Sequence, residues 1–209
     1  MRNLVLPDEL EIVSLVGSGR RSDVYKGCYQ SIPVAIKIYK KEYIEKYLYK
    51  YKVDIGEFEY ERNTIAYRAD KISRYIAKPY LLLRAEDGFT PALVQEFVEG
   101  TRLLDLLQQE HRLPKETLEA GYMIVKETAL LGLYDLDISP GNIQLVRDDS
   151  GQWIPKLYDF NLMPQHLRPP NPFMRIGFWL GLRSKNHRDY RSLRQWEKLG
   201  RQAEVNNSK

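Results

Sequence analysis

The stretch GLYDLDISPGNIQL, residues 132–145, carries more polar detail than a solvated loop requires. Two acids, Asp135 and Asp137, precede a Pro-Gly turn, and Asn142 follows it directly before the alternating apolar pattern of a strand. A hydrophilic loop would explain the polarity. It would not explain an acid and an amide five positions apart across a tight turn, so this interval suggests that Asp137 and Asn142 hold something together.

The composition of the 209 residues is that of an ordinary globular protein, with 43% hydrophobic and 29% charged residues. The single cysteine, Cys28, cannot form an internal disulfide, which favours a reducing compartment. The N-terminal apolar run is broken by Pro7 and acids, so it does not resemble a signal peptide. No stretch reaches the roughly 18 apolar residues of a membrane span. We therefore expect a cytoplasmic protein.

The net charge of +4 is unevenly distributed along the chain. Residues 164–209 carry ten Lys and Arg against three acids, a balance of +7, which leaves −3 for the remainder. Such asymmetry indicates an anionic partner for the C-terminal segment.

The pattern of apolar and turn-forming residues predicts a β-rich first half with one helix, followed by a helical second half with a β-hairpin. A connector near residues 97–101 separates the two, so we expect one lobe over 1–97 and another over 98–209. The expected strands lie at 11–17, 23–29, 33–40, 79–84, 91–98, 142–146 and 155–160, and the expected helices at 41–69, 101–111 and 114–133.

Gly17 and Gly19 lie between the first two expected strands, in VGSGRRSDVY. Without side chains there, backbone N–H groups could approach phosphate oxygens. A third glycine is absent, and Ser22 stands in its place. Taken alone, this pattern is more typical of a simple turn.

Lys37 lies in the middle of the next expected strand, in VAIKIY, between two isoleucines. A single lysine in a strand more often faces solvent. On the second strand beyond a glycine-rich hairpin, however, it is also placed to bind phosphate.

Phosphoryl transfer from ATP requires a metal held by oxygen ligands, an acid that orients a hydroxyl, and cations on the phosphates. Asp137 could accept the proton of the acceptor hydroxyl, while Asn142 and Asp159 could bind magnesium. Asp159 follows Asn142 by the length of one β-hairpin, which would return it beside the loop.

These motifs together resemble the protein-kinase-like superfamily over residues 11–163. GSGRRSDV resembles the glycine-rich loop, VAIK the nucleotide lysine motif, LDISPGN the catalytic loop, and DFN stands where the family has Asp-Phe-Gly. The resemblance implies an α+β, two-lobed fold with an antiparallel β-sheet N-lobe and a truncated helical C-lobe. It also implies a kinase that uses ATP and Mg²⁺ to phosphorylate a hydroxyl of a protein or of a sugar or glycolipid.

The family also pairs the lysine with a helix glutamate. Of the acids in GEFEYERNTIAYR, Glu57 and Glu61 share a helix face whereas Glu59 points elsewhere. We favour Glu61, because Ile65 follows on its face and would pack inward; a solvated acidic face is the alternative. The nucleotide-binding residues that the resemblance implies are Gly17, Ser18, Gly19, Val24, Ala35, Lys37, Glu61, Glu96 and Val98.

Several positions depart from the family pattern. Leu136 replaces the arginine of the catalytic loop, Ser139 stands where many protein kinases have a lysine, and Asn161 replaces the glycine after Asp-Phe. These changes leave open a nucleotide-binding pseudokinase that acts as a regulatory or scaffold module. The short remainder after Met163 resembles minimal bacterial members, such as lipopolysaccharide-core sugar kinases and kinase-like proteins of the PhoP regulatory network, and favours a non-protein acceptor.

The basic, aromatic C-terminal segment has two interpretations. It could dock on an anionic membrane surface at the inner face of the membrane or on a phosphorylated glycolipid. It could instead form a terminal helix that covers the helical lobe, which we favour because a short lobe must bury its apolar surface. No nucleic-acid-binding motif is present, so we expect no specific nucleic-acid partner.

Overall fold

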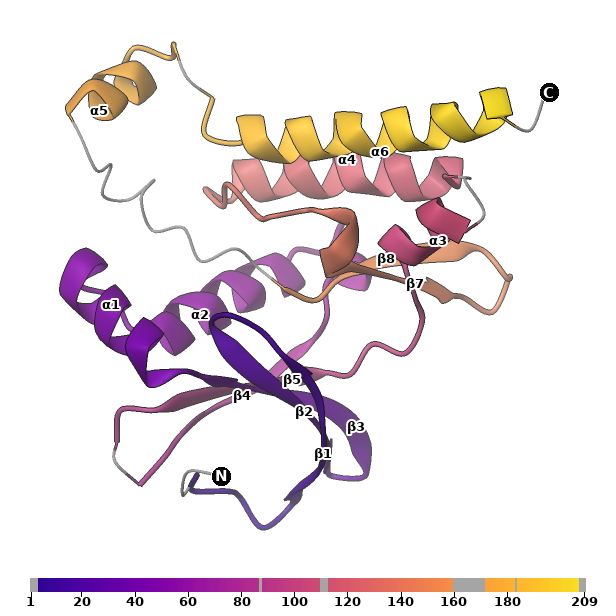
Figure 1. The fold of residues 1–209 in the computed structure, drawn as a ribbon. Coiled ribbons are helices and arrows are strands. Elements are labelled where there is room, and N and C mark those ends of the chain that lie inside the picture. Colours follow the sequence, from indigo (N-terminus) through magenta and orange to yellow (C-terminus); the bar gives the residue numbers. More distant parts are fainter. Residues whose placement is uncertain (1–3, 87, 110–112, 160–171, 183, 207–209) are drawn as a thin grey trace. The chain divides into compact units, whose positions relative to one another are not determined.

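A computed structural model describes residues 4–86, 88–109, 113–159, 172–182 and 184–206 (Figure 1). The chain divides into two compact units, each with its own internal packing. Unit 1 comprises residues 1–64 and 77–97, and unit 2 comprises residues 65–76 and 98–209. The boundary after residue 97 coincides with the expected connector. Residues 65–76, however, group with unit 2 instead of the N-terminal lobe, because Ala66, Ile72 and Ile76 pack in the core of that unit.

Unit 1 is built on a five-stranded antiparallel sheet in the order β1-β2-β3-β5-β4. The central strand β3 carries the buried residues Val34 and Ile36, which lie in one core cluster with Val94 of the neighbouring strand β5 and Leu83 of the edge strand β4. The β-branched and leucine-rich runs of the sequence thus form the core of this sheet. The strands are β1 (Leu10–Ser18), β2 (Ser22–Tyr29), β3 (Ile32–Tyr39), β4 (Pro79–Arg84) and β5 (Pro91–Glu96).

The single helix expected over 41–69 is two helices, α1 (Lys41–Tyr51) and α2 (Ile55–Tyr67). Lys52 ends α1 in the left-handed conformation, with φ of 56°. The Asp54 carboxylate then accepts the backbone N–H groups of Gly56 and Glu57, which satisfies free donors at the start of α2. The break therefore lies at residues 52–54, and Gly56 is inside the second helix.

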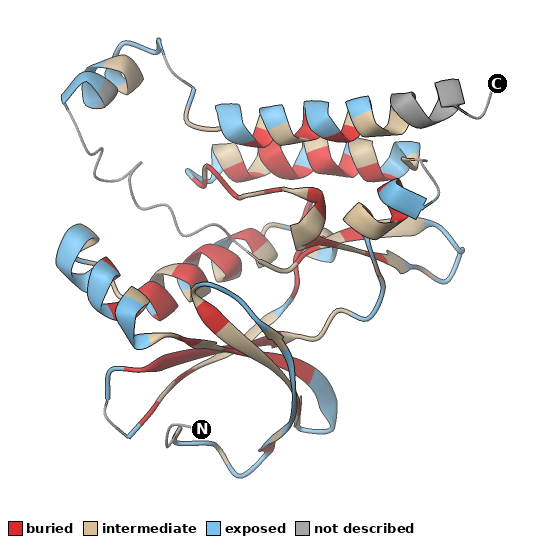
Figure 2. Ribbon diagram, in the orientation of Figure 1, coloured by how far each residue is buried: buried red, intermediate tan, exposed pale blue. Residues whose placement is uncertain are grey.

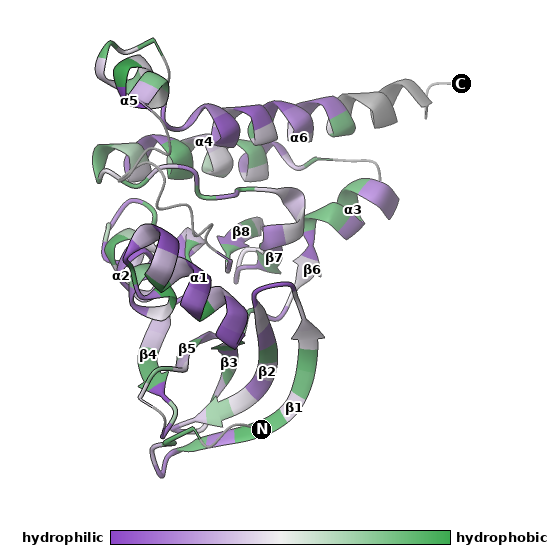
Figure 3. Ribbon diagram, turned by 60° about the vertical axis from the view of Figure 1, so that its left-hand side comes forward, coloured by the Kyte–Doolittle hydropathy of each residue, from purple (hydrophilic) through white to green (hydrophobic). Residues whose placement is uncertain are grey.

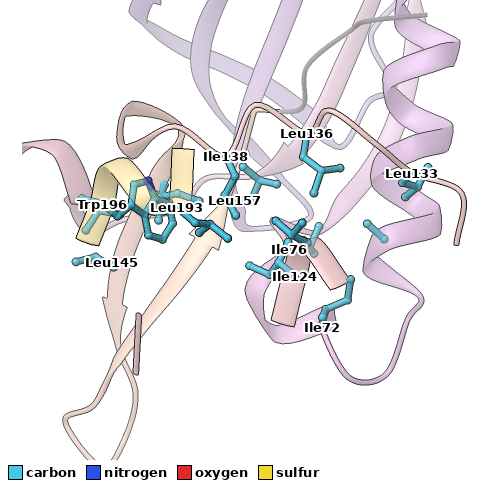
Figure 4. Close-up of a cluster of buried hydrophobic side chains, with 14 of the residues drawn as sticks. Ile72, Ile76, Ile124, Leu133, Leu136, Ile138, Leu145, Leu157, Leu193 and Trp196 are labelled. Carbon is cyan, nitrogen blue, oxygen red and sulfur yellow. The ribbon is translucent and has the colours of Figure 1, made fainter. Parts of the chain in front are cut away.

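Unit 2 combines helices with a small three-stranded sheet, β6-β7-β8. Its core gathers buried leucines and isoleucines from the helices, the sheet and the 132–145 stretch (Figure 4). The elements are η1 (Ser73–Tyr75), β6 (Thr101–Arg102), α3 (Leu103–Gln109), α4 (Lys115–Leu130), η2 (Pro140–Asn142), β7 (Ile143–Arg147), β8 (Trp153–Leu157), α5 (Pro172–Trp179) and α6 (His187–Asn206).

The C-terminal helix α6 packs along α4 (Figures 1 and 2). Leu193 and Trp196 of α6 are completely buried, and both contact the position of Gly121 on α4. A Cβ at Gly121 would lie 2.7 Å from Leu193 Cδ2, so the glycine permits the close approach. The expectation that the C-terminal segment covers the helical unit is thus met by α6.

No helix in the described part of the chain is long and apolar enough to cross a membrane.

Candidate functional site

A buried ion pair joins the central strand of unit 1 to helix α2. Lys37 on β3 donates from Nζ to Glu59 Oε1 at 2.6 Å, and the second carboxylate oxygen accepts the Tyr39 hydroxyl. Lys37 is 7% exposed and Glu59 is completely buried. Either charge would be costly to bury alone, so each holds the other in place. The pair therefore fixes the Lys37 ammonium group at a defined position on the sheet.

The pairing corrects the sequence-based choice of Glu61, which is exposed, as is Ile65 on the same side of α2. The face of α2 turned toward the sheet carries Glu59 and Asn63, and Asn63 Nδ2 donates to Gln95 Oε1 at 3.2 Å. Because polar residues occupy this buried face, the apolar periodicity of the sequence favoured the opposite side of α2, which carries Glu61. The other acid, Glu57, pairs with Arg84.

The turn after β1 is held closed by its own side chains. Ser18 Oγ donates to Asp23 Oδ1 at 2.6 Å, and Lys40 Nζ donates to the Gly19 carbonyl oxygen at 2.7 Å. The Ser18 hydrogen bond and the nearby Lys40 charge lower the pKa of Asp23. No heavy atom among the described residues lies within 4 Å of a Cβ built at Gly17, so its backbone has open space beside it.

The remaining residues expected to contact a nucleotide lie on or next to the sheet of unit 1. Val24 on β2 is the register partner of Lys37, and Ala35 lies two positions before Lys37, hence on the same face of β3. Glu96 ends β5, where its carboxylate accepts the Lys78 backbone N–H at 3.0 Å. Val98 follows as the first residue of unit 2 in this part of the chain and is half-buried.

The stretch around Asp137 in unit 2 is a strongly curved loop that ends in η2. Asp137 adopts φ of 58°, in the left-handed region that aspartate tolerates better than most residues. Its carbonyl oxygen accepts both the Ser139 backbone N–H at 2.7 Å and the Asn142 side-chain Nδ2 at 2.9 Å. The five-residue interval is therefore a structural unit in which Asn142 closes the loop on the backbone of Asp137.

The β7–β8 hairpin returns Asp159 to the same loop. The Tyr158 backbone N–H donates to the Asn142 carbonyl oxygen at 3.3 Å, and the Tyr158 hydroxyl donates to the carbonyl oxygen of Gly141. Asp159 is therefore the residue directly after the one that hydrogen-bonds to Asn142.

The side chains of Asn142 and Asp159 are the candidate ligands for a magnesium ion. They fit an ion that takes the rest of its coordination from phosphate. Because Asn142 Nδ2 is used by the backbone of Asp137, the amide oxygen is the end that could bind an ion. The described residues contain no group of three His, Cys, Asp or Glu arranged to hold a metal. One amide and one carboxylate match the sparse protein ligation that Mg²⁺ accepts beside substrate phosphates.

Helix α6 anchors the 132–145 stretch, a role that the sequence did not reveal. Asp189 Oδ1 accepts the Leu136 backbone N–H at 2.9 Å, and Arg188 Nη1 donates to Asp135 Oδ2 at 3.0 Å. Leu136 itself is completely buried in the core of unit 2, which accounts for an apolar residue at this position. The register of α6 could have signalled Asp189, since it shares a helix face with Leu193, four positions on.

Asp189 is a buried acid in an unfavourable environment. Burial, followed by the charge of Asp135, raises its pKa to about 7. Its Oδ2 atom has no hydrogen-bond partner among the described residues. The Asp189 carboxyl group, which anchors the loop, is therefore expected to change its protonation state near neutral pH.

A polar cavity of about 240 Å³ opens between the loop and α6 within unit 2. Asp137 borders this cavity. The residues lining it are Asp135, Asp137, Arg188, Asp189, Arg191, Ser192 and Gln195.

Comparison with known protein families finds no matching family. No curated protein matches the sequence either. Among solved structures, the chain is similar to the kinase Rad53, in a crystal structure of its complex with AMP-PNP, with a TM-score of 0.55 and 19% identity. The match covers 74% of this chain and 39% of the Rad53 chain.

At this identity the likeness shows the fold: a mixed α+β chain with an antiparallel sheet in the N-terminal unit, a helical C-terminal unit and a kinase-like two-lobed architecture. The expected fold class is thereby confirmed. Residues 160–171, which include Asn161 of the DFN motif, lie outside the described residues.

Proposed function

We propose that this protein is an ATP- and Mg²⁺-dependent phosphotransferase that delivers a phosphoryl group to a hydroxyl of a protein or of a sugar or glycolipid. The observation that carries the proposal is the buried Lys37–Glu59 pair on a kinase-like fold. A strand lysine held by a helix glutamate is the arrangement that protein kinases use to bind nucleotide phosphates.

Each chemical role that phosphoryl transfer requires has a candidate in the chain. Lys37, positioned by Glu59, would bind the α- and β-phosphates, and the glycine-bearing turn would lie over the phosphates. Asp137 would accept the hydrogen bond of the acceptor hydroxyl and orient it. Asn142 and Asp159 would hold Mg²⁺, which when bound neutralises charge on the phosphates.

The cavity beside Asp137 bears on the chemical class of the acceptor. The cavity beside Asp137 is lined by arginine, serine and glutamine side chains and suits a hydroxylated acceptor. Protein and sugar hydroxyls both satisfy this description, and the proposal covers both.

Incubation of the purified chain with γ-labelled ATP, Mg²⁺ and fractionated cell extract tests the proposal. We expect label in protein or glycolipid with the wild type, and a loss of roughly 10²–10⁴-fold in initial rate with Asp137→Asn, as for removal of a group that handles the reacting proton. Asp149→Asn, an exposed acid in the β7–β8 turn, is the matched control and should transfer at the wild-type rate. ATP binding without transfer to any fraction would instead identify a pseudokinase.

A further inference from the structure

Helix α5 exposes large apolar side chains to an unusual degree. Phe173 is 85% exposed, Trp179 84% and Leu182, just beyond the helix, 77%. Isolated exposed apolar residues are ordinary, but several together on one short segment indicate an interaction surface.

Phe173, Ile176 and Trp179 share one side of the helix. Positions 173, 176 and 179 recur at helical spacing. We call Phe173, Ile176 and Trp179 of the helix, together with Leu180 and Leu182 just beyond its end, the α5 apolar face. Ile176 and Leu180 are about half exposed, at 50% and 53%. Figure 3 shows that α5 is largely hydrophobic and that much of α6 is hydrophilic.

Exposed cations accompany this face. Arg175 lies on α5, and the solvent side of α6 presents a cationic face, opposite the buried Leu193 and Trp196. Its members recur every three or four residues, so they lie along one side of the helix. The α6 cationic face consists of Arg191, Arg194 and Lys198.

We propose that α5 docks on an anionic lipid bilayer, with its apolar face inserted among the headgroups and the α6 cationic face attracted to the lipid charges. Tryptophan and phenylalanine are suited to this boundary, where one side is apolar and the other wet. At eight residues, α5 is too short to span a bilayer and would lie in the interface.

Charge distinguishes this occupant from a second copy of the chain. Residues 164–209 carry a balance of +7, so apposing two such segments would bring like charges together, whereas an anionic surface neutralises them. The inference goes beyond the proposed phosphotransfer and stands without it, because neither face includes the residues assigned to ATP.

Co-flotation with vesicles tests the proposal on the full chain. Vesicles of phosphatidylcholine alone are compared with vesicles that contain phosphatidylglycerol at about one lipid in three. We expect binding to the anionic vesicles, weaker binding at high salt, and a blue shift of tryptophan emission from the exposed Trp179. Trp196 is already completely buried and should not contribute to the shift.

Matched variants locate the contact. The double variant Phe173→Ser/Leu182→Ser should bind anionic vesicles at least about tenfold more weakly, since it removes two large apolar side chains. Phe89→Ser/Leu130→Ser alters residues of the same types that are 72% and 74% exposed elsewhere, and should bind like the wild type. Both variants should keep the wild-type thermal midpoint, because all four side chains are exposed.

The electrostatic part has its own control. Arg194→Gln/Lys198→Gln should weaken binding to anionic vesicles by roughly tenfold or more. Lys46→Gln/Lys50→Gln removes the same charge from helix α1 and should have little effect. The proposal would be overturned if the wild type bound no vesicles, or if the Phe173/Leu182 variant and its control bound them equally. It would also be overturned if the wild type bound no vesicles but formed a dimer that the Phe173/Leu182 variant could not form.

Discussion

The Lys37–Glu59 pair makes the sharpest prediction about stability, because a neighbouring glutamate on the same helix provides a control. Glu59 is completely buried and lies 2.6 Å from the lysine ammonium, whereas Glu61 is exposed. Glu59→Gln keeps the size of the side chain and removes only its charge. The change removes the carboxylate charge that lies 2.6 Å from the buried Lys37 ammonium.

The expected loss follows from that burial. Unit charges about 4 Å apart at an effective dielectric constant of about 20 attract by about 4 kcal/mol. Removal of one member of a buried pair typically costs about 3–5 kcal/mol, since the other charge stays desolvated. We therefore expect Glu59→Gln to lower the free energy of unfolding by about 3 kcal/mol. Glu61→Gln should change it by less than about 0.5 kcal/mol, as for other exposed sites.

Urea denaturation of the wild type and the two variants at neutral pH measures both values, provided the slopes agree. Calorimetric titration with ATP should show the same order, with affinity lost in Glu59→Gln and kept in Glu61→Gln. If Glu61→Gln proved as destabilising as Glu59→Gln, or if Glu59→Gln were neutral, the pairing would be wrong.

Three further changes probe other parts of the fold. Asp189 binds its proton more tightly when folded, so the wild type should gain about 2–3 kcal/mol of unfolding free energy from this group between about pH 8 and about pH 5; Asp189→Asn should lack that gain in urea titrations at the two pH values. Gly121→Ala places a Cβ 2.7 Å from Leu193 and 2.9 Å from Trp196, and should lower the free energy of unfolding by about 1–3 kcal/mol; an unchanged urea midpoint would contradict the close packing of α4 on α6. Asp54→Ala removes the acceptor for two backbone N–H groups at the start of α2 and should lower the free energy of unfolding by about 1 kcal/mol. Urea denaturation measures this loss, and an unchanged free energy of unfolding would contradict the capping role of Asp54.

The sequence predicted those parts of the molecule whose chemistry is local. Strand alternation located the sheet of unit 1, and the Pro-Gly pair located the turn between Asp137 and Asn142, because both signals act within a few residues. The hairpin length also returned Asp159 to Asn142, as expected from two short strands and a turn.

The sequence was less informative where the partner is distant and the buried face is polar. Glu59 was missed because α2 turns Glu59, Arg62 and Asn63 toward the core, so its apolar periodicity is weak. The register of α6 could place Asp189 on the buried face, but not identify its partner, because the Leu136 backbone lies 53 residues earlier and no local pattern reports such a contact.

Transfer of the γ-phosphate is the measurement that tests the central claim most directly. With Mg²⁺ and γ-labelled ATP, the wild type should release or transfer label, Asp137→Asn and Asp159→Asn should lose this activity by at least about a hundredfold, and Asp149→Asn should retain it. Label turnover that is unchanged in Asp137→Asn and Asp159→Asn, or a wild type that binds ATP and never turns it over, would contradict the account.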